Sequence, residues 1–141
     1  PRVLGFAARE ADIVGINATM TSGAIDASTF DSMTADAVDG KVELVRRVAT
    51  EAGRLDDIEM NLRAFMVFVT DDVDQALGTL SEFTGAPEEV IADSPFALVG
   101  PTDRIIDLLQ ERRERWGFSY VIVGQNDVEP FAPVVAALAG T

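Results

Sequence analysis

The stretch "RRERWGFSYVIVG", residues 112–124, changes character at Gly117. Before this glycine the sequence is charged, as is common near the end of a helix. After it, residues 118–123 are almost entirely apolar. Glycine commonly follows the last residue of a helix, and a strand with so little polar alternation needs cover on both faces, as in a parallel sheet. The stretch therefore predicts a helix that ends at Gly117 and a buried strand directly after it.

The same alternation of helix and strand extends through the chain. Apolar residues at helical spacing predict helices at residues 2–10, 34–53, 71–80, 87–93, 103–116 and 131–140. Short apolar runs predict strands at residues 12–17, 58–69 and 118–123. The polar residues 18–32 predict a long loop after the first strand. This alternation indicates parallel β/α units, in which helices cover both faces of a sheet or one face of a closed barrel.

Polar residues suited to helix starts precede three of these helices. The predicted caps are Thr34 or Asp36, Asp71 or Asp72, and Thr102. The basic residues of the helix at 34–53 are predicted to face solvent: Lys41, Arg46 and Arg47.

A chain of 141 residues is long enough for one domain with a core. Three strands, however, form a narrow sheet with two unpaired edges, and too few residues remain to cover its second face. We therefore expect residues 1–141 to be part of a single barrel domain whose remainder supplies the missing cover. The start at Pro1, inside a predicted helix, adds to the expectation that the chain is a fragment.

The composition excludes several classes of function. The net charge of −13 opposes binding to the phosphates of nucleic acids and to anionic membranes. The absence of Cys and His removes disulfides, zinc sites of the usual ligand types and imidazole catalysis. No apolar run approaches the length of a membrane span, and no signal peptide is apparent. We expect a cytoplasmic protein that binds neither nucleic acid, membrane nor metal.

Four stretches together resemble the carboxy-terminal part of the luciferase-like flavin- and deazaflavin-dependent oxidoreductases. They are "RVLGFAAREADIVGIN", "KVELVRRVATEAGRLDDIEMNL", "ADSPFALVGPTDRIIDLLQERRERWGFSYVIVG" and "FAPVVAALAG". The resemblance covers almost the whole chain and is strongest to an actinobacterial subfamily that uses the deazaflavin coenzyme F-420. It implies a (β/α)8 TIM barrel, of which this chain carries roughly the last three β/α units with parallel strands. A full barrel takes about 250 residues, so this chain is little more than half of one. The resemblance implies that the family's first five strands, and the glycine-rich segment before the position of Pro1, are absent.

The barrel fold points to candidate site residues, because active sites of such barrels lie at the carboxyl ends of the strands. For the first strand these are the predicted substrate-pocket residues Asn17, Thr19, Met20 and Thr21. For the other two strands they are Thr70 with Asp71, and Gly124 with Gln125 and Asn126. Ordinary turns and caps are the competing interpretation of every one of them.

The amino end of the first helix is a second candidate site, since free N–H groups and the helix dipole favour a phosphate there. The resemblance implies that the phosphate of the cofactor lies near this end. Arg2 and Val3 are therefore the predicted cofactor-binding residues. No catalytic residue is assigned, because no spacing in the chain demands that role.

Other polar groups have simpler explanations. The Gly100-Pro101-Thr102 turn predicts a helix start rather than a phosphate loop, since proline lacks an amide donor. The acidic pairs 56–57, 71–72 and 88–89 indicate helix capping and solvation rather than metal binding. The basic cluster at 110–116 is interpreted as a solvated face balanced by glutamate. Asn61 and Arg63 are either buried polar groups or part of a pocket rim.

Two classes of function follow. The first is part of an oxidoreductase that transfers a hydride between coenzyme F-420 and a small organic substrate, with an FMN-dependent monooxygenase as its alternative. The second is a non-catalytic α/β binding or assembly module that closes its edges by self-association. In both cases we expect a homo-oligomer or a partner that is the missing amino-terminal half of the barrel.

Overall fold

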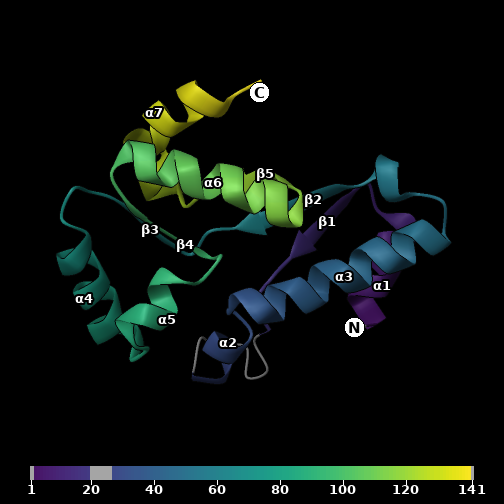
Figure 1. The fold of residues 1–141 in the computed structure, drawn as a ribbon, viewed down its shortest axis with the longest axis horizontal. Coiled ribbons are helices and arrows are strands. Elements are labelled where there is room, and N and C mark those ends of the chain that lie inside the picture. Colours follow the sequence, from purple (N-terminus) through teal and green to yellow (C-terminus); the bar gives the residue numbers. More distant parts are fainter. Residues whose placement is uncertain (1, 20–26, 141) are drawn as a thin grey trace.

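The computed structural model describes residues 2–19 and 27–140 (Figure 1). The strands among them are β1 (Ile13–Ile16), β2 (Glu59–Arg63), β3 (Met66–Val69), β4 (Ala97–Gly100) and β5 (Phe118–Ile122). The α-helices are α1 (Arg2–Glu10), α2 (Ala27–Asp31), α3 (Ala35–Glu51), α4 (Val73–Thr84), α5 (Glu88–Ala92), α6 (Thr102–Trp116) and α7 (Val128–Leu138). Short 3-10 turns lie at Leu55–Asp57 and Gln125–Asp127.

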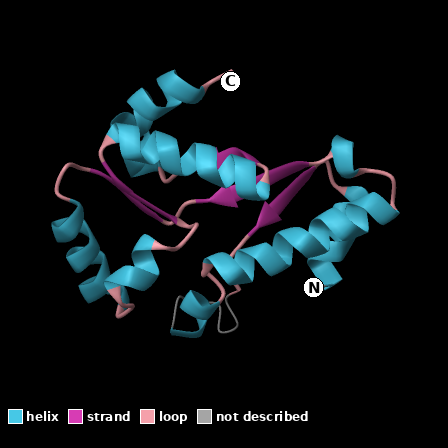
Figure 2. Ribbon diagram, viewed as in Figure 1, coloured by secondary structure: helices cyan, strands magenta, loops and turns pink. Residues whose placement is uncertain are grey.

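The described strands form two parallel sheets (Figure 2). One has the order β1-β2-β5, and the other pairs β3 with β4. Every pairing is parallel, so helices provide the crossovers between paired strands. The predicted architecture of parallel β/α units is confirmed.

The helix, glycine and strand predicted from the opening stretch are confirmed. Helix α6 ends at Trp116, and Gly117 adopts the left-handed conformation with φ 79°, donating its N–H to the Arg113 carbonyl at 2.8 Å. A left-handed position of this kind favours glycine because it has no Cβ. Strand β5 begins at the next residue, Phe118.

Two of the three predicted caps are also confirmed. The Thr34 hydroxyl accepts a hydrogen bond from the Ala37 N–H, and the Asp72 carboxylate accepts one from the Gln75 N–H. The prediction for Thr102 was wrong, because α6 begins at Thr102 itself and Pro101 precedes it without a side-chain cap.

The single strand predicted at 58–69 is two strands that belong to different sheets. The chain leaves β2 at Ala64, whose N–H donates to the Ile122 carbonyl. The next two N–H groups, of Phe65 and Met66, both donate to the Phe96 carbonyl, and β3 then pairs with β4. A continuous apolar run shows that a segment is buried, but it does not show which strand the segment pairs with. The prediction of one strand was therefore wrong.

Two short elements were not predicted. Strand β4 has only four residues, all buried, and it lies between Pro95 and Pro101. Helix α2 lies within the predicted loop at 18–32 and has five residues. Helix α2 is too short for helical periodicity to indicate it.

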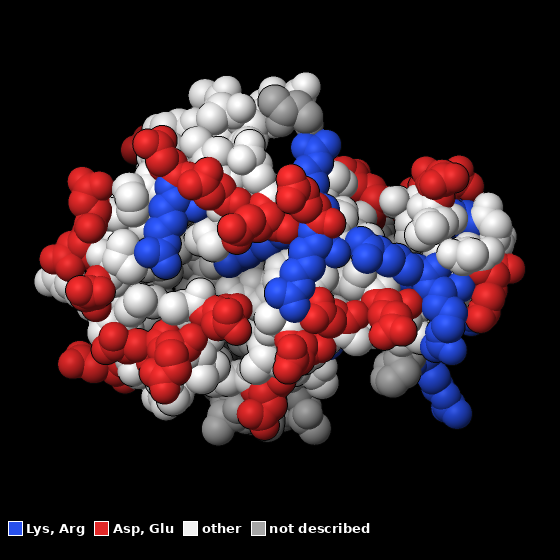
Figure 3. Space-filling model, in the orientation of Figure 1, with Lys and Arg blue, Asp and Glu red and all other residues white. Residues whose placement is uncertain are grey.

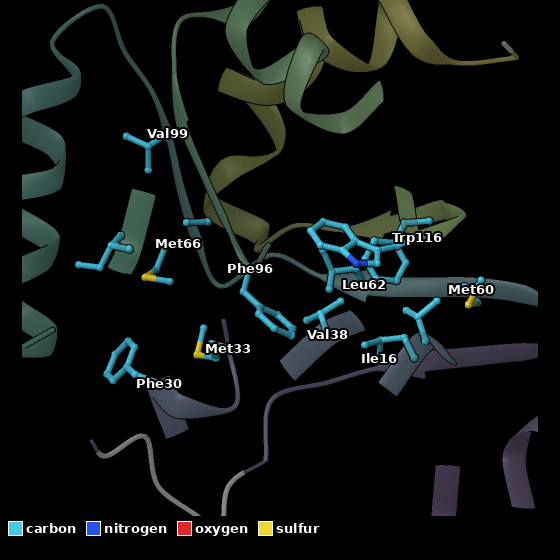
Figure 4. Packing of buried hydrophobic residues seen from close by; sticks show 14 of the residues in the cluster. Ile16, Phe30, Met33, Val38, Met60, Leu62, Met66, Phe96, Val99 and Trp116 are labelled. Carbon is cyan, nitrogen blue, oxygen red and sulfur yellow. The ribbon is translucent and has the colours of Figure 1, made fainter. Parts of the chain in front are cut away.

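Helices cover one face of the three-stranded sheet. In Figure 1, α3 and α6 lie across the same side of the strands. The main core cluster lies beneath them, and Figure 4 shows Ile16, Leu62 and Trp116 packed together with Val38 of α3. A second, smaller cluster joins β4, α6 and α7 around Leu98, Ile105 and Phe131.

The opposite face of this sheet is open. Side chains alternate along a strand, and the residues that point away from the core include Ile13, Tyr120 and Ile122, which are 50%, 42% and 38% exposed. The apolar strand predicted at 118–123 needs cover on both faces. The helices among the described residues cover one face of its sheet only. Within the described part of the chain, no helix is both long and apolar enough to cross a bilayer.

Candidate functional site

A pocket lies at the carboxyl end of β1 and brings together residues predicted to form two separate sites. Its volume is about 460 Å3. Asn17 and Thr19 follow β1, and Val3 reaches the same pocket from the first turn of α1. Arg2 is exposed at the start of that helix. Met20 and Thr21 lie outside the described residues.

Lys41 is part of this pocket, although the sequence placed it on the solvent-facing side of its helix. The structure corrects that prediction, since Lys41 is half-buried and lines the pocket from α3. Its Nζ donates to the Asn17 and Ser32 carbonyls, at 2.9 Å each. Burial lowers the pKa of the Lys41 ammonium. Two sequence signals could have drawn attention to it: it is the single lysine of the chain, and it lies four residues before Val45 on the apolar side of its helix.

Further hydrogen bonds connect the two segments whose carbonyls Lys41 contacts. The Ser32 hydroxyl donates to the Thr29 carbonyl at 2.7 Å and accepts from the Thr19 N–H at 2.8 Å. Lys41 therefore joins the end of β1 to the end of α2, and the backbone next to Asn17 and Thr19 is held from two directions.

The open face of the sheet continues from the pocket. The register aligns Gly15, Asn61 and Tyr120 across the three strands. A Cβ at Gly15 would lie 3.1 Å from Asn17 Nδ2 and 3.6 Å from Asn61 Oδ1, so the two amides converge over this glycine. The Asn61 amide also donates to the Tyr120 carbonyl at 3.0 Å. Gly15 thus provides the space in which these polar groups approach each other.

Asn61 and Arg63, predicted to be either buried polar groups or part of a pocket rim, differ in burial. Asn61 is buried, at 8% exposure, and its amide lies on the open face beside Gly15. Arg63 is exposed, with its guanidinium carbon 5.3 Å from the centre of the Phe65 ring. Asn61 is therefore a buried polar group beside Gly15, and Arg63 is an exposed residue at the end of β2.

The residues predicted at the carboxyl ends of the other strands do not all lie at the same sheet edge as Asn17. Thr70 and Asp71 follow β3, which belongs to the second sheet, so their inclusion at the same edge was wrong. Thr70 instead accepts a hydrogen bond from the Asp72 N–H at 3.1 Å. In the three-stranded sheet, β2 ends at Arg63. Gly124 follows β5 and donates its N–H to the Asp127 carboxylate at 3.1 Å.

The basic cluster of α6 is largely structural. Arg112 is buried rather than solvated, which corrects the prediction, and its Nη2 donates to the Ser94 and Ala97 carbonyls at 3.2 and 2.7 Å. Burial lowers the pKa of Arg112 to about 10. Arg115 donates two hydrogen bonds to the Asp39 carboxylate, at 3.1 and 2.6 Å. Figure 3 shows the basic side chains interleaved with acidic ones over α3 and α6.

Asp39 also accepts a hydrogen bond from the Trp116 indole at 2.6 Å. The hydrogen bonds from Arg115 and Trp116 lower the pKa of this carboxyl group. Among the described residues, no group of three carboxylates is placed to hold a metal ion. The predicted capping role of the acidic pairs is confirmed at Asp72. Glu88 and Glu89 lie in the first turn of α5, which has no side-chain cap.

The chain has no match among protein-family models or curated protein sequences. It does resemble solved structures. Monooxygenase RslO1 from Streptomyces bottropensis aligns over 87% of this chain and 37% of its own, with 18% identity and a TM-score of 0.54. The coenzyme F420-dependent tetrahydromethanopterin reductase from Methanopyrus kandleri aligns over 96% of this chain and 46% of its own, with 18% identity and a TM-score of 0.61.

The chain therefore spans less than half the length of either structure. Both neighbours are luciferase-like TIM-barrel proteins. At this level of identity the likeness concerns the fold alone: the chain has the fold of part of a (β/α)8 TIM barrel.

Proposed function

We propose that the chain is the carboxy-terminal part of a luciferase-like oxidoreductase that transfers a hydride between coenzyme F-420 and a small organic substrate. The observation that carries this proposal is the pocket at the end of β1, where Val3, Asn17 and Thr19 come together. Barrel enzymes place their active sites at this end of their strands. One structural neighbour is named as F420-dependent and the other as a monooxygenase, which supports a flavin or deazaflavin cofactor.

The residues present fit such a group. Gly15 leaves space on the sheet face, while the amides of Asn17 and Asn61 offer donors and acceptors beside it. Tyr120 adds a partly exposed aromatic ring in the same row. When bound, the deazaflavin would supply the hydride-transfer chemistry, and this chain would bind it, orient it and exclude water. These roles need neither the His nor the Cys that the chain lacks.

The cover of the open sheet face belongs to the same proposal. We assign it to the amino-terminal half of the barrel, since closing a barrel removes exposed strand edges. A second copy of this chain is the alternative. Either would shield Ile13, Tyr120 and Ile122 from water.

Fluorescence titration with the deazaflavin coenzyme and with FMN tests the proposal, using this polypeptide and any longer natural form of the protein. Saturable binding of the deazaflavin supports F-420-dependent hydride transfer. Saturable binding of FMN alone supports the monooxygenase instead. Binding by the longer form only would support an incomplete barrel. Failure of both cofactors with both polypeptides would contradict the proposal and favour a binding or assembly module.

Gly15→Val should weaken cofactor binding at least about tenfold, equivalent to about 1.4 kcal/mol. The added side chain would enter the space between Asn17 and Asn61. The same titration measures the effect. Gly78→Val is the matched control, because Gly78 lies on α4 and its Cβ would make only an ordinary contact with Glu88. Equal affinities of the two variants would exclude this face from the site.

A further inference from the structure

Lys41 places a single positive charge in the pocket at the carboxyl end of β1. Among the described residues that line this pocket, Lys41 alone is charged. In the same part of the chain, no carboxylate lies within ion-pair distance of its Nζ. The chain as a whole has a net charge of −13, so the pocket differs in sign from most of the surface. This local charge favours an anionic ligand.

The hydrogen bonds of Lys41 hold its ammonium group in place and leave one donor. An ammonium has three N–H donors. Two of them bind the Asn17 and Ser32 carbonyls, at 2.9 Å each. The third N–H remains for a ligand. Because the side chain is already fixed by two hydrogen bonds, it loses little conformational freedom when the ligand binds.

The rest of the lining limits the size and polarity of this ligand. Val3 and Leu4 of α1, with Ala37 and Leu44 of α3, provide apolar walls. The volume of about 460 Å3 is enough for a small organic molecule. One N–H of a single cation beside apolar walls suits a carboxylate with a short aliphatic chain. A phosphate ester has a charge of about −1.5 to −2 and three acceptor oxygens, which need more donors.

We propose that this pocket binds a small aliphatic carboxylate and that Lys41 selects it by charge. Nζ donates one charge-assisted hydrogen bond to a carboxylate oxygen, and its hydrogen bonds to the Asn17 and Ser32 carbonyls are kept. That this carboxylate belongs to the substrate of the hydride transfer rests on the proposed function, to which it adds the chemical class of the substrate.

Titration with sodium pentanoate tests the proposal. When lysine alone is labelled with nitrogen-15, the chain gives one backbone amide signal in NMR spectra, because Lys41 is its single lysine. The shift of this signal is followed at neutral pH and constant ionic strength. Pentanamide is the matched ligand, since it has the same aliphatic chain without the charge. Pentanoate should bind at least about tenfold more tightly than pentanamide, as expected for one hydrogen bond to a charged group.

Two variants separate selection by charge from a structural role of Lys41. Lys41→Met should bind the two ligands with equal affinity, whereas Arg47→Met, which removes an exposed cation of the same helix, should keep the difference. Ligand-detected saturation-transfer NMR measures both affinities without the lysine label. A loss of the hydrogen bonds to Asn17 and Ser32 would weaken both ligands alike, so the ratio of the two affinities reports the charge.

Equal affinities of pentanoate and pentanamide for the original chain would overturn the proposal, and so would an absence of binding by both. Inorganic phosphate is titrated in the same way, because the first turn of α1 lies at the same pocket. Tighter binding of phosphate than of pentanoate would overturn the proposal in favour of a phosphate site. These titrations contain no cofactor, so their failure is distinguishable from a failure of the proposed hydride transfer.

Discussion

Phe96→Ala should lower the free energy of unfolding by about 3 to 5 kcal/mol, the usual cost of truncating a buried phenylalanine. Phe96 is fully buried, and Figure 4 shows it between Met33 and Val38. Its ring lies 5.9 Å from that of Phe65, where the chain passes from one sheet to the other. The variant would leave a cavity at the place where the two sheets meet. Urea denaturation followed by the fluorescence of Trp116, the single tryptophan, measures the change.

Phe83→Ala is the matched control, because Phe83 is 87% exposed on α4. The same chemical change there should alter the free energy of unfolding by no more than about 0.5 kcal/mol. If both variants lost the same stability, the burial of Phe96 would not be what stabilises this junction.

Arg112→Met should lower the free energy of unfolding by about 2 to 3 kcal/mol, because two buried carbonyls would lose their donor. The guanidinium of Arg112 connects α6 to the Ser94 and Ala97 carbonyls, on the segment that enters β4. The Ser94 hydroxyl in turn donates to the Met33 carbonyl at 2.9 Å, so the arginine supports a connection that extends to the segment between α2 and α3. Methionine keeps much of the apolar length of the side chain but cannot donate.

The comparison variant is Arg47→Met, in which the arginine removed is exposed on α3. Its stability should lie within about 0.5 kcal/mol of the original chain. Urea denaturation of the two variants measures the difference. An unchanged stability of Arg112→Met would mean that relief of the buried charge offsets the lost hydrogen bonds. It would contradict the structural role assigned here.

The part of the candidate site nearest β1 could be predicted from the sequence. Asn17 and Thr19 follow a short β-branched run, and the end of a parallel strand is where polar site residues occur. The prediction that Lys41 faces solvent with Arg46 and Arg47 was wrong, because Val38 and Val45, three residues before and four after it, lie on the buried face of α3. Only the packing of α3 against β1 turns it toward the Asn17 carbonyl.

The sequence by itself determined the alternation of the longer helices with parallel strands and the end of α6 at Gly117. These features depend on local conformational preference and on the spacing of apolar residues. Tertiary structure alone decided that residues 58–69 divide between two sheets and that Arg112 is buried. Both depend on which distant segment supplies the hydrogen-bond partner, such as Phe96 for Met66 or Ala97 for Arg112. Local sequence carries no record of a partner about 15 to 30 residues away, because contact between such segments is decided only when the chain packs.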